Sequence, residues 1–156
     1  MNGTLHRTFT VERMLPGSPR HAFRFWSDQA LKRAWTDCHA DWTVLEERFD
    51  FRAGGDEVKR WRMPGGETLS FRARYFDIEP PRRIVYAFDM AFDAARQSVS
   101  LATVELFAAA GGTRMLFTEQ IAFLGGDEAL RGRVAGTAEG FDRLVSVIAA
   151  RRAGVQ

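Results

Sequence analysis

The chain is poor in cysteine and histidine and has no long hydrophobic run. Its 156 residues include one cysteine, Cys38, and three histidines. A single cysteine excludes an intramolecular disulfide and favours a reducing compartment. The N-terminus lacks the apolar core of a secretory signal, and no segment approaches the length of a membrane-spanning helix. We therefore expect a cytoplasmic protein with no membrane partner.

The sequence also lacks a large excess of charge of either sign. The sequence carries 22 lysines and arginines against 20 acidic residues, which gives a net charge of +2. No dense basic run or nucleic-acid recognition motif accompanies the arginines, so we expect no nucleic-acid partner. The simpler interpretation is that the arginines solvate the outer faces of strands and helices.

Phenylalanine and tryptophan are abundant instead. The 13 Phe and 4 Trp residues against 2 Tyr, within a 46% hydrophobic composition, indicate a globular chain. The length suits one domain over residues 1–156 with a sizeable core. Rings that form few hydrogen bonds can fill that core, or they can line a pocket for an apolar guest.

The first quarter of the sequence predicts a strand followed by two short helices. Residues 5–14 alternate polar and apolar side chains, as a half-buried strand does. Ser18 is a good N-cap, and Pro19 fits the first helical position, where its missing N–H costs nothing. Asp28 can cap a second short helix that ends near Trp35.

The middle of the sequence predicts an antiparallel sheet, because strands follow one another through short turns. A change of face near Phe76 indicates a bulge. In the first strand of this region we expect an apolar side made of Thr43, Leu45, Phe49 and Phe51. The expected strands cover residues 42–52, 56–63, 67–78, 84–90, 98–107 and 113–123.

Residues 127–152 predict a C-terminal helix. Its first half is weakened by three glycines, Gly132, Gly136 and Gly140. We therefore expect a bend there or a start near Thr137. The apolar stripe that packs the second half against the sheet consists of Phe141, Leu144, Val145 and Ile148.

Four stretches in this order resemble one protein family. They are Ser18-Pro19 with Phe23, Trp26, Asp28, Leu31 and Trp35; Asp50-Phe51-Arg52-Ala53-Gly54-Gly55; Ile78 with Pro80-Pro81-Arg82-Arg83-Ile84-Val85-Tyr86; and Gly136 through Leu144. Together they resemble the group named for the C-terminal domain of the activator of the heat shock protein 90 ATPase. That group belongs to the START-like, pollen-allergen-like superfamily (SRPBCC). The resemblance covers roughly residues 6–150.

The resemblance implies an α+β helix-grip fold. In this fold a curved antiparallel sheet wraps around a long C-terminal helix, and two short helices follow the first strand. A hollow beneath the helix can then hold a ligand. The resemblance implies no particular reaction, because members share shape more than activity and most bacterial members have no assigned reaction. We therefore do not transfer chaperone stimulation on fold likeness alone.

We expect neither a metal nor another cofactor. Cys38, His39 and Asp41 form the only local cluster of metal-ligand types, and their spacing crowds them into one turn without a fourth ligand. We interpret this cluster as a polar loop. The glycine pairs lack the strand–loop–helix setting and the Lys-Ser/Thr ending of phosphate loops, so we interpret them as hairpin and bulge residues.

Glu119 is the main candidate for chemistry. We expect it to share a strand face with Met115, Phe117 and Ile121, which places an acid among apolar groups. Burial disfavours the charge of such an acid unless an arginine or tyrosine approaches it. Glu119 could then orient a ligand or act as a general base. Alternatively, it lies near the strand end, where it reaches water or pairs with an arginine.

Three hypotheses about function follow. The leading one is a protein that binds an apolar or amphipathic small molecule. The second is a cyclase- or hydrolase-like enzyme with Glu119 as acid or base, so enzymatic activity stays open. The third is a protein-interaction or co-chaperone-like module, or a homodimer. For the first hypothesis, the expected ligand-binding residues are Trp26, Trp35, Trp61, Phe71, Tyr75, Tyr86, Phe88, Phe117, Glu119, Phe141 and Leu144.

Overall fold

The computed structural model describes residues 3–37 and 39–153, and within them the chain forms seven strands and three helices. The predicted α+β class and the predicted order of elements are confirmed. In order, the elements are β1 (Leu5–Leu15), α1 (Pro19–Ser27), α2 (Gln29–Thr36), β2 (Thr43–Phe49), β3 (Asp56–Arg62), β4 (Thr68–Glu79), β5 (Arg83–Phe92), β6 (Ala95–Ala109), β7 (Gly112–Phe123) and α3 (Asp127–Ala153).

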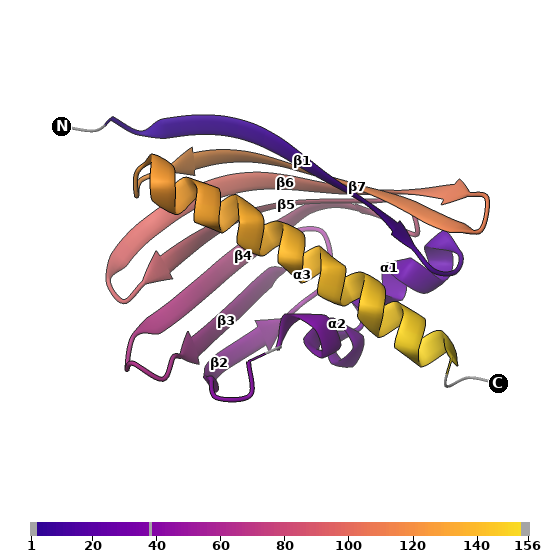
Figure 1. Ribbon diagram of the computed structural model, residues 1–156, viewed down its shortest axis with the longest axis horizontal. Helices are drawn as coiled ribbons and strands as arrows, with labels where there is room; N and C mark the ends of the chain where they lie inside the picture. Colours follow the sequence, from indigo (N-terminus) through magenta and orange to yellow (C-terminus); the bar gives the residue numbers. More distant parts are fainter. Residues whose placement is uncertain (1–2, 38, 154–156) are drawn as a thin grey trace.

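The strands of the described residues form one antiparallel sheet with the order β1-β7-β6-β5-β4-β3-β2. The sheet is curved, and α3 lies across one of its faces (Figure 1). The short helices α1 and α2 lie beside the C-terminal half of α3. This is the helix-grip arrangement that the sequence predicts.

The two short helices begin where the sequence predicts. The side chain of Ser18 accepts a hydrogen bond from the backbone N–H of His21 at 3.2 Å, and Pro19 is the first residue of α1. The side chain of Asp28 accepts a hydrogen bond from the backbone N–H of Leu31 at 3.1 Å and caps α2. Because free N–H groups at a helix start need partners, these caps fix where each helix begins.

Strand β2 differs from the prediction. It ends at Phe49, and Leu45 is exposed instead of facing inward. The register with β3 shifts between Val44 and Glu46, so the alternation of side chains reverses at this irregularity. As a result Glu47, and not Leu45, shares the inner face with Phe49.

Helix α3 also starts earlier than one of the predicted alternatives. It begins at Asp127, ten residues before Thr137, and continues to Ala153. Arg13 of β1 fastens it to the sheet by donating hydrogen bonds to Asp142 at 2.8 Å and to the carbonyl of Ala138 at 3.4 Å. The predicted apolar stripe packs in the second half of the helix, where Phe141, Leu144 and Ile148 are buried.

Candidate functional site

A pocket of about 570 Å³ lies between the sheet and α3. All three helices and the strands β2 to β7 contribute to its wall. Exposed residues such as Arg48 and Phe92 belong to that wall, so the pocket opens to solvent. Its volume falls within the range of small-molecule sites in proteins.

Most of the predicted ligand-binding residues lie on this wall. Tyr75 and Leu144 do not; both are buried in the core away from the pocket wall. The hydroxyl of Tyr75 is occupied by Glu57, and Leu144 lies in the packed half of α3. A role of the others in binding stays a prediction. The predicted residues that line the pocket are Trp26, Trp35, Trp61, Phe71, Tyr86, Phe88, Phe117, Glu119 and Phe141.

Helix α3 presents small residues to the pocket. Ala129, Gly132, Gly136 and Gly140 lie on the wall, and their spacing of three and four residues places them on one helix face. A β-carbon added to Gly132 or Gly136 would meet no atom within 4 Å. Both glycines are exposed, so the space beside this part of the helix is open and is not filled by protein atoms. From the sequence we expected these glycines only to weaken the helix.

Glu119 is fully buried on β7, and its two oxygens differ. Oε2 accepts hydrogen bonds from the Ser100 hydroxyl at 2.6 Å and from Nη2 of Arg133 at 3.0 Å. Oε1 is buried and accepts no hydrogen bond from any described residue, and Nε of Arg133 likewise lacks an acceptor. Burial among apolar groups and pairing with an arginine therefore occur together at Glu119.

A second carboxylate, Glu57 of β3, is paired with Lys32 of α2. The Lys32 ammonium and the Tyr75 hydroxyl both donate to Oε1 of Glu57, at 2.6 Å and 2.5 Å. The ammonium also lies 5.2 to 5.9 Å from the ring centres of Trp26, Phe49 and Tyr75, within cation–π range. Burial, followed by the charge and hydrogen bond of Glu57, raises the pKa of Tyr75, so its hydroxyl remains a donor.

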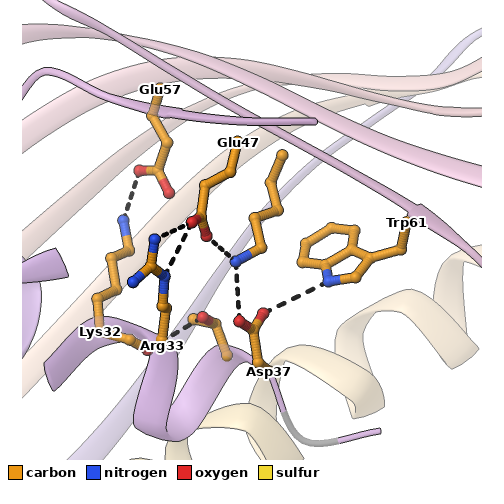
Figure 2. Close-up of polar contacts among 8 residues, drawn as sticks. Lys32, Arg33, Asp37, Glu47, Glu57 and Trp61 are labelled. Atoms are coloured by element: carbon orange, nitrogen blue, oxygen red, sulfur yellow. Dashed lines mark hydrogen bonds and ion pairs between the residues drawn. The ribbon is translucent and has the colours of Figure 1, made fainter. Parts of the chain in front are cut away.

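A further ion-pair network joins α2 to β2 and β3 (Figure 2). Arg33 donates to one oxygen of Glu47, and Lys59 donates to the other oxygen and to Asp37, the latter at 2.9 Å. The indole N–H of Trp61 reaches the second oxygen of Asp37 at 3.4 Å. The hydrogen bonds from Arg33 and then Lys59 lower the pKa of Glu47 to about 2, although burial acts in the opposite direction.

The sequence did not lead us to expect charged residues of β3 on the pocket wall. Glu57 and Lys59 are only 8% and 5% exposed, which is unusual for charged side chains. The available signal was alternation along β3, which carries both of them to the face of Trp61. Their burial depends on cations and acids from α2, and a strand pattern does not show such partners.

Within the described residues, no group of three or more His, Cys, Asp or Glu side chains is arranged to hold a metal ion. Cys38 of the predicted polar cluster lies outside the described residues. Its neighbour His39 stacks on Trp42, with 4.1 Å between ring centres. No helix in the described part of the chain is both long and apolar enough to cross a membrane.

Residues 16–150 match the family described as activator of Hsp90 ATPase homolog 1-like protein. The chain belongs to this family. The predicted resemblance is thereby confirmed, and the matched segment spans the pocket wall from Trp26 to Arg143.

Solved structures share the fold of this family member over nearly the whole chain. A putative uncharacterized protein from Rhizobium leguminosarum is 38% identical, with 95% of this chain and 97% of that chain covered and a TM-score of 0.89. The Mll3558 protein from Rhizobium loti is 38% identical, with 94% and 99% covered and a TM-score of 0.85. Protein CV1439 from Chromobacterium violaceum, at 21% identity, 90% and 96% coverage and a TM-score of 0.74, shows the fold alone. No curated protein matches the sequence.

Proposed function

We propose that the protein binds an apolar or amphipathic small molecule in the pocket beneath α3. The observation that carries this proposal is the empty space beside Gly132 and Gly136. Each glycine destabilises a helix by about 1 kcal/mol relative to alanine. A side chain that reached from either position into the pocket would gain about 0.8 kcal/mol for each methylene that it buried. A helix selected only for packing would therefore carry larger side chains at these positions, and a guest explains their absence.

The chemistry of the wall fits such a guest. Phe71 lies 5.1 Å from Phe88 between ring centres, and Phe88 lies 5.6 Å from Tyr86, so three rings of β4 and β5 form a continuous surface. Glu119 and Arg133 provide a few polar atoms beside it. Pockets of this kind hold an apolar body by burial and orient it through a small number of hydrogen bonds.

Tryptophan fluorescence offers a direct test, because Trp26, Trp35, Trp42 and Trp61 all line the pocket. Anilinonaphthalene sulfonate serves as the probe. The substitution Gly136→Leu places a side chain on the pocket wall, whereas the control Ala135→Leu adds the same residue at an exposed position of α3 that does not line the pocket. We expect the control to bind like the wild type and Gly136→Leu to lose about tenfold or more in affinity.

Leucine is a better helix former than glycine and only slightly poorer than alanine, so both variants should fold, and thermal unfolding verifies this. Unchanged probe binding by folded Gly136→Leu would overturn the proposal. Native mass spectrometry of the purified wild type adds an independent check, because a retained guest would appear as added mass that Gly136→Leu lacks.

A second candidate function is catalysis by Glu119. The specific observation is its oxygen Oε1, which lies buried on the pocket wall without a partner among the described residues and is therefore available to a bound molecule's proton. Incubation with aromatic and polyketide-type compounds, followed by mass spectrometry, would detect a product. Glu119→Gln should then abolish turnover while naphthalene still quenches the tryptophans. No product from any compound would remove this candidate and leave binding as the function.

A further inference from the structure

The carboxylates on the pocket wall are of two kinds. Both oxygens of Glu47 accept hydrogen bonds from cationic side chains. Glu57 accepts hydrogen bonds only at Oε1, and Glu119 accepts them only at Oε2. The second oxygen of each has no donor among the described residues. Oε1 of Glu119 is buried, and because buried polar groups normally have partners, it indicates where a ligand would bind. Glu57 also lines the pocket, and its second oxygen is left open to a ligand's donor.

The two half-paired carboxylates lie on the same face of the sheet with an aromatic surface between them. In register, Glu119 of β7 lies two strands from Tyr86 of β5, and Glu57 of β3 lies two strands from Phe88 of β5 on the other side. Burial and then the charges of Glu119 and Glu57 raise the pKa of the Tyr86 hydroxyl. Both carboxylates are therefore within electrostatic reach of one group in the middle of the pocket.

The unpartnered atoms select the chemistry of the ligand's polar groups. Beside the free oxygen of Glu119, the same ion pair contains Nε of Arg133, a buried donor without an acceptor among the described residues. A hydroxyl group can donate to the oxygen and accept from the nitrogen. An ammonium group only donates and would be repelled by the guanidinium. A carboxylate only accepts and would be repelled by Glu119.

The two walls of the pocket favour a ligand with a flat body. On one side lie the rings of Phe71, Tyr86 and Phe88, and on the other lies the helix face that contains Gly132 and Gly136. Ring systems stack well on such aromatic surfaces. At Gly132 and Gly136 the helix carries no side chain, so a flat body can approach the backbone closely there.

We propose that the ligand is a flat, apolar ring compound with two hydroxyl groups, one bound by Glu119 and the other by Glu57. This inference rests on the proposed function of the pocket as a binding site. It adds to that function the number of polar groups, their chemistry and the residues that receive them.

The test compares naphthalene, naphthol and a naphthalenediol whose hydroxyls lie on opposite rings. Quenching of the pocket tryptophans in the full chain gives the affinity of each probe. A hydrogen bond to a charged group strengthens binding about tenfold, so each added hydroxyl should raise the affinity by about that factor. Methoxynaphthalene, which accepts but cannot donate, should bind about as weakly as naphthalene.

Glutamine variants assign each hydroxyl to its residue. In Glu119→Gln, the amide oxygen is held by Ser100 and Arg133, so an NH₂ group replaces the free acceptor. The advantage of naphthol over methoxynaphthalene should then disappear. Glu57→Gln should remove the additional gain of the naphthalenediol over naphthol. Glu46 lies outside the pocket wall, so the control Glu46→Gln should leave the ratios between the affinities of the probes unchanged.

The outcomes separate the two proposals. Equal affinities of all probes for the wild type would overturn this inference and leave the binding function standing. Absence of binding by every probe, naphthalene included, would overturn the binding function and this inference with it. If a glutamine variant fails to fold, the wild-type series still decides whether hydroxyl groups are recognised.

Discussion

Two ion-paired clusters beside the pocket use the same residue types but differ in completeness. In the network of α2, β2 and β3, all four oxygens of Glu47 and Asp37 accept hydrogen bonds from described residues (Figure 2). In the pair between β7 and α3, Glu119 and Arg133 each retain a buried atom without a partner in the described chain.

This difference distinguishes a network that stabilises the fold from an ion pair that could bind a ligand. A ligand that approached the complete network would have to break existing hydrogen bonds, so the network's role is to hold α2 against the sheet. A ligand that approached the pair of Glu119 and Arg133 would instead satisfy atoms that already lack partners. We therefore use the completeness of pairing, and not the mere presence of charge, to place the proposed binding region on the wall.

The largest effect is expected from breaking the complete network. Lys59 is 5% exposed and is shared by Glu47 and Asp37. Lys59→Met removes that shared cation and should lower the free energy of unfolding by about 3 kcal/mol, as measured with urea. The neighbouring Arg60 is half-exposed, so Arg60→Met should change the free energy of unfolding by no more than about 0.5 kcal/mol. Equal costs for the two variants would show that the network does not hold the fold.

A smaller, pH-dependent effect should arise from Glu47. Its folded-state pKa of about 2 is below the ordinary 4.5, so the carboxylate contributes stability that is complete above pH 4.5. That stability is lost as the pH falls from 4.5 toward 2. Because the partner Arg33 is partly in solvent, we expect a contribution of about 1–2 kcal/mol.

Urea unfolding of the wild type and Glu47→Gln at about pH 7 and about pH 3 measures this contribution. The wild type should be the more stable form at the higher pH, and most of its advantage should be gone at the lower pH. Glu46→Gln on the same strand is the control and should show little pH-dependent difference from the wild type. A gap that stays constant with pH would mean that Glu47 acts through packing and not through its charge.

The fold could be predicted wherever the deciding signals are local. The caps Ser18 and Asp28 are such signals, because each depends on residues within a few positions of it. Alternation likewise predicted the inner faces of β4, β5 and β7. Strand β2 was predicted wrongly around Leu45, because its register shift depends on pairing with β3 and no local pattern reports that pairing.

The candidate site could be predicted only in part for the same reason. Its aromatic wall and Glu119 follow from alternation along single strands. Glu57 and Lys59 were missed because a charged residue on a strand is normally expected to face solvent. Their burial depends on Lys32 and Asp37, which are more than twenty residues away in the chain. The glycines of α3 were noticed, but their position on the pocket wall required the packed structure.

The smallest expected effect tests whether the glycine face serves recognition. Gly136→Ala adds a methyl group that meets no atom within 4 Å, so it should raise the free energy of unfolding by about 1 kcal/mol. The same methyl group enters the space proposed for a flat ligand and should weaken naphthol binding. Gly126→Ala is the control: its φ of +97° strains any other residue, so this variant should be less stable than the wild type but bind naphthol normally. If Gly136→Ala is more stable and binds as tightly as the wild type, the glycine face does not contact the ligand, and only the carboxylates distinguish the binding region from the rest of the wall.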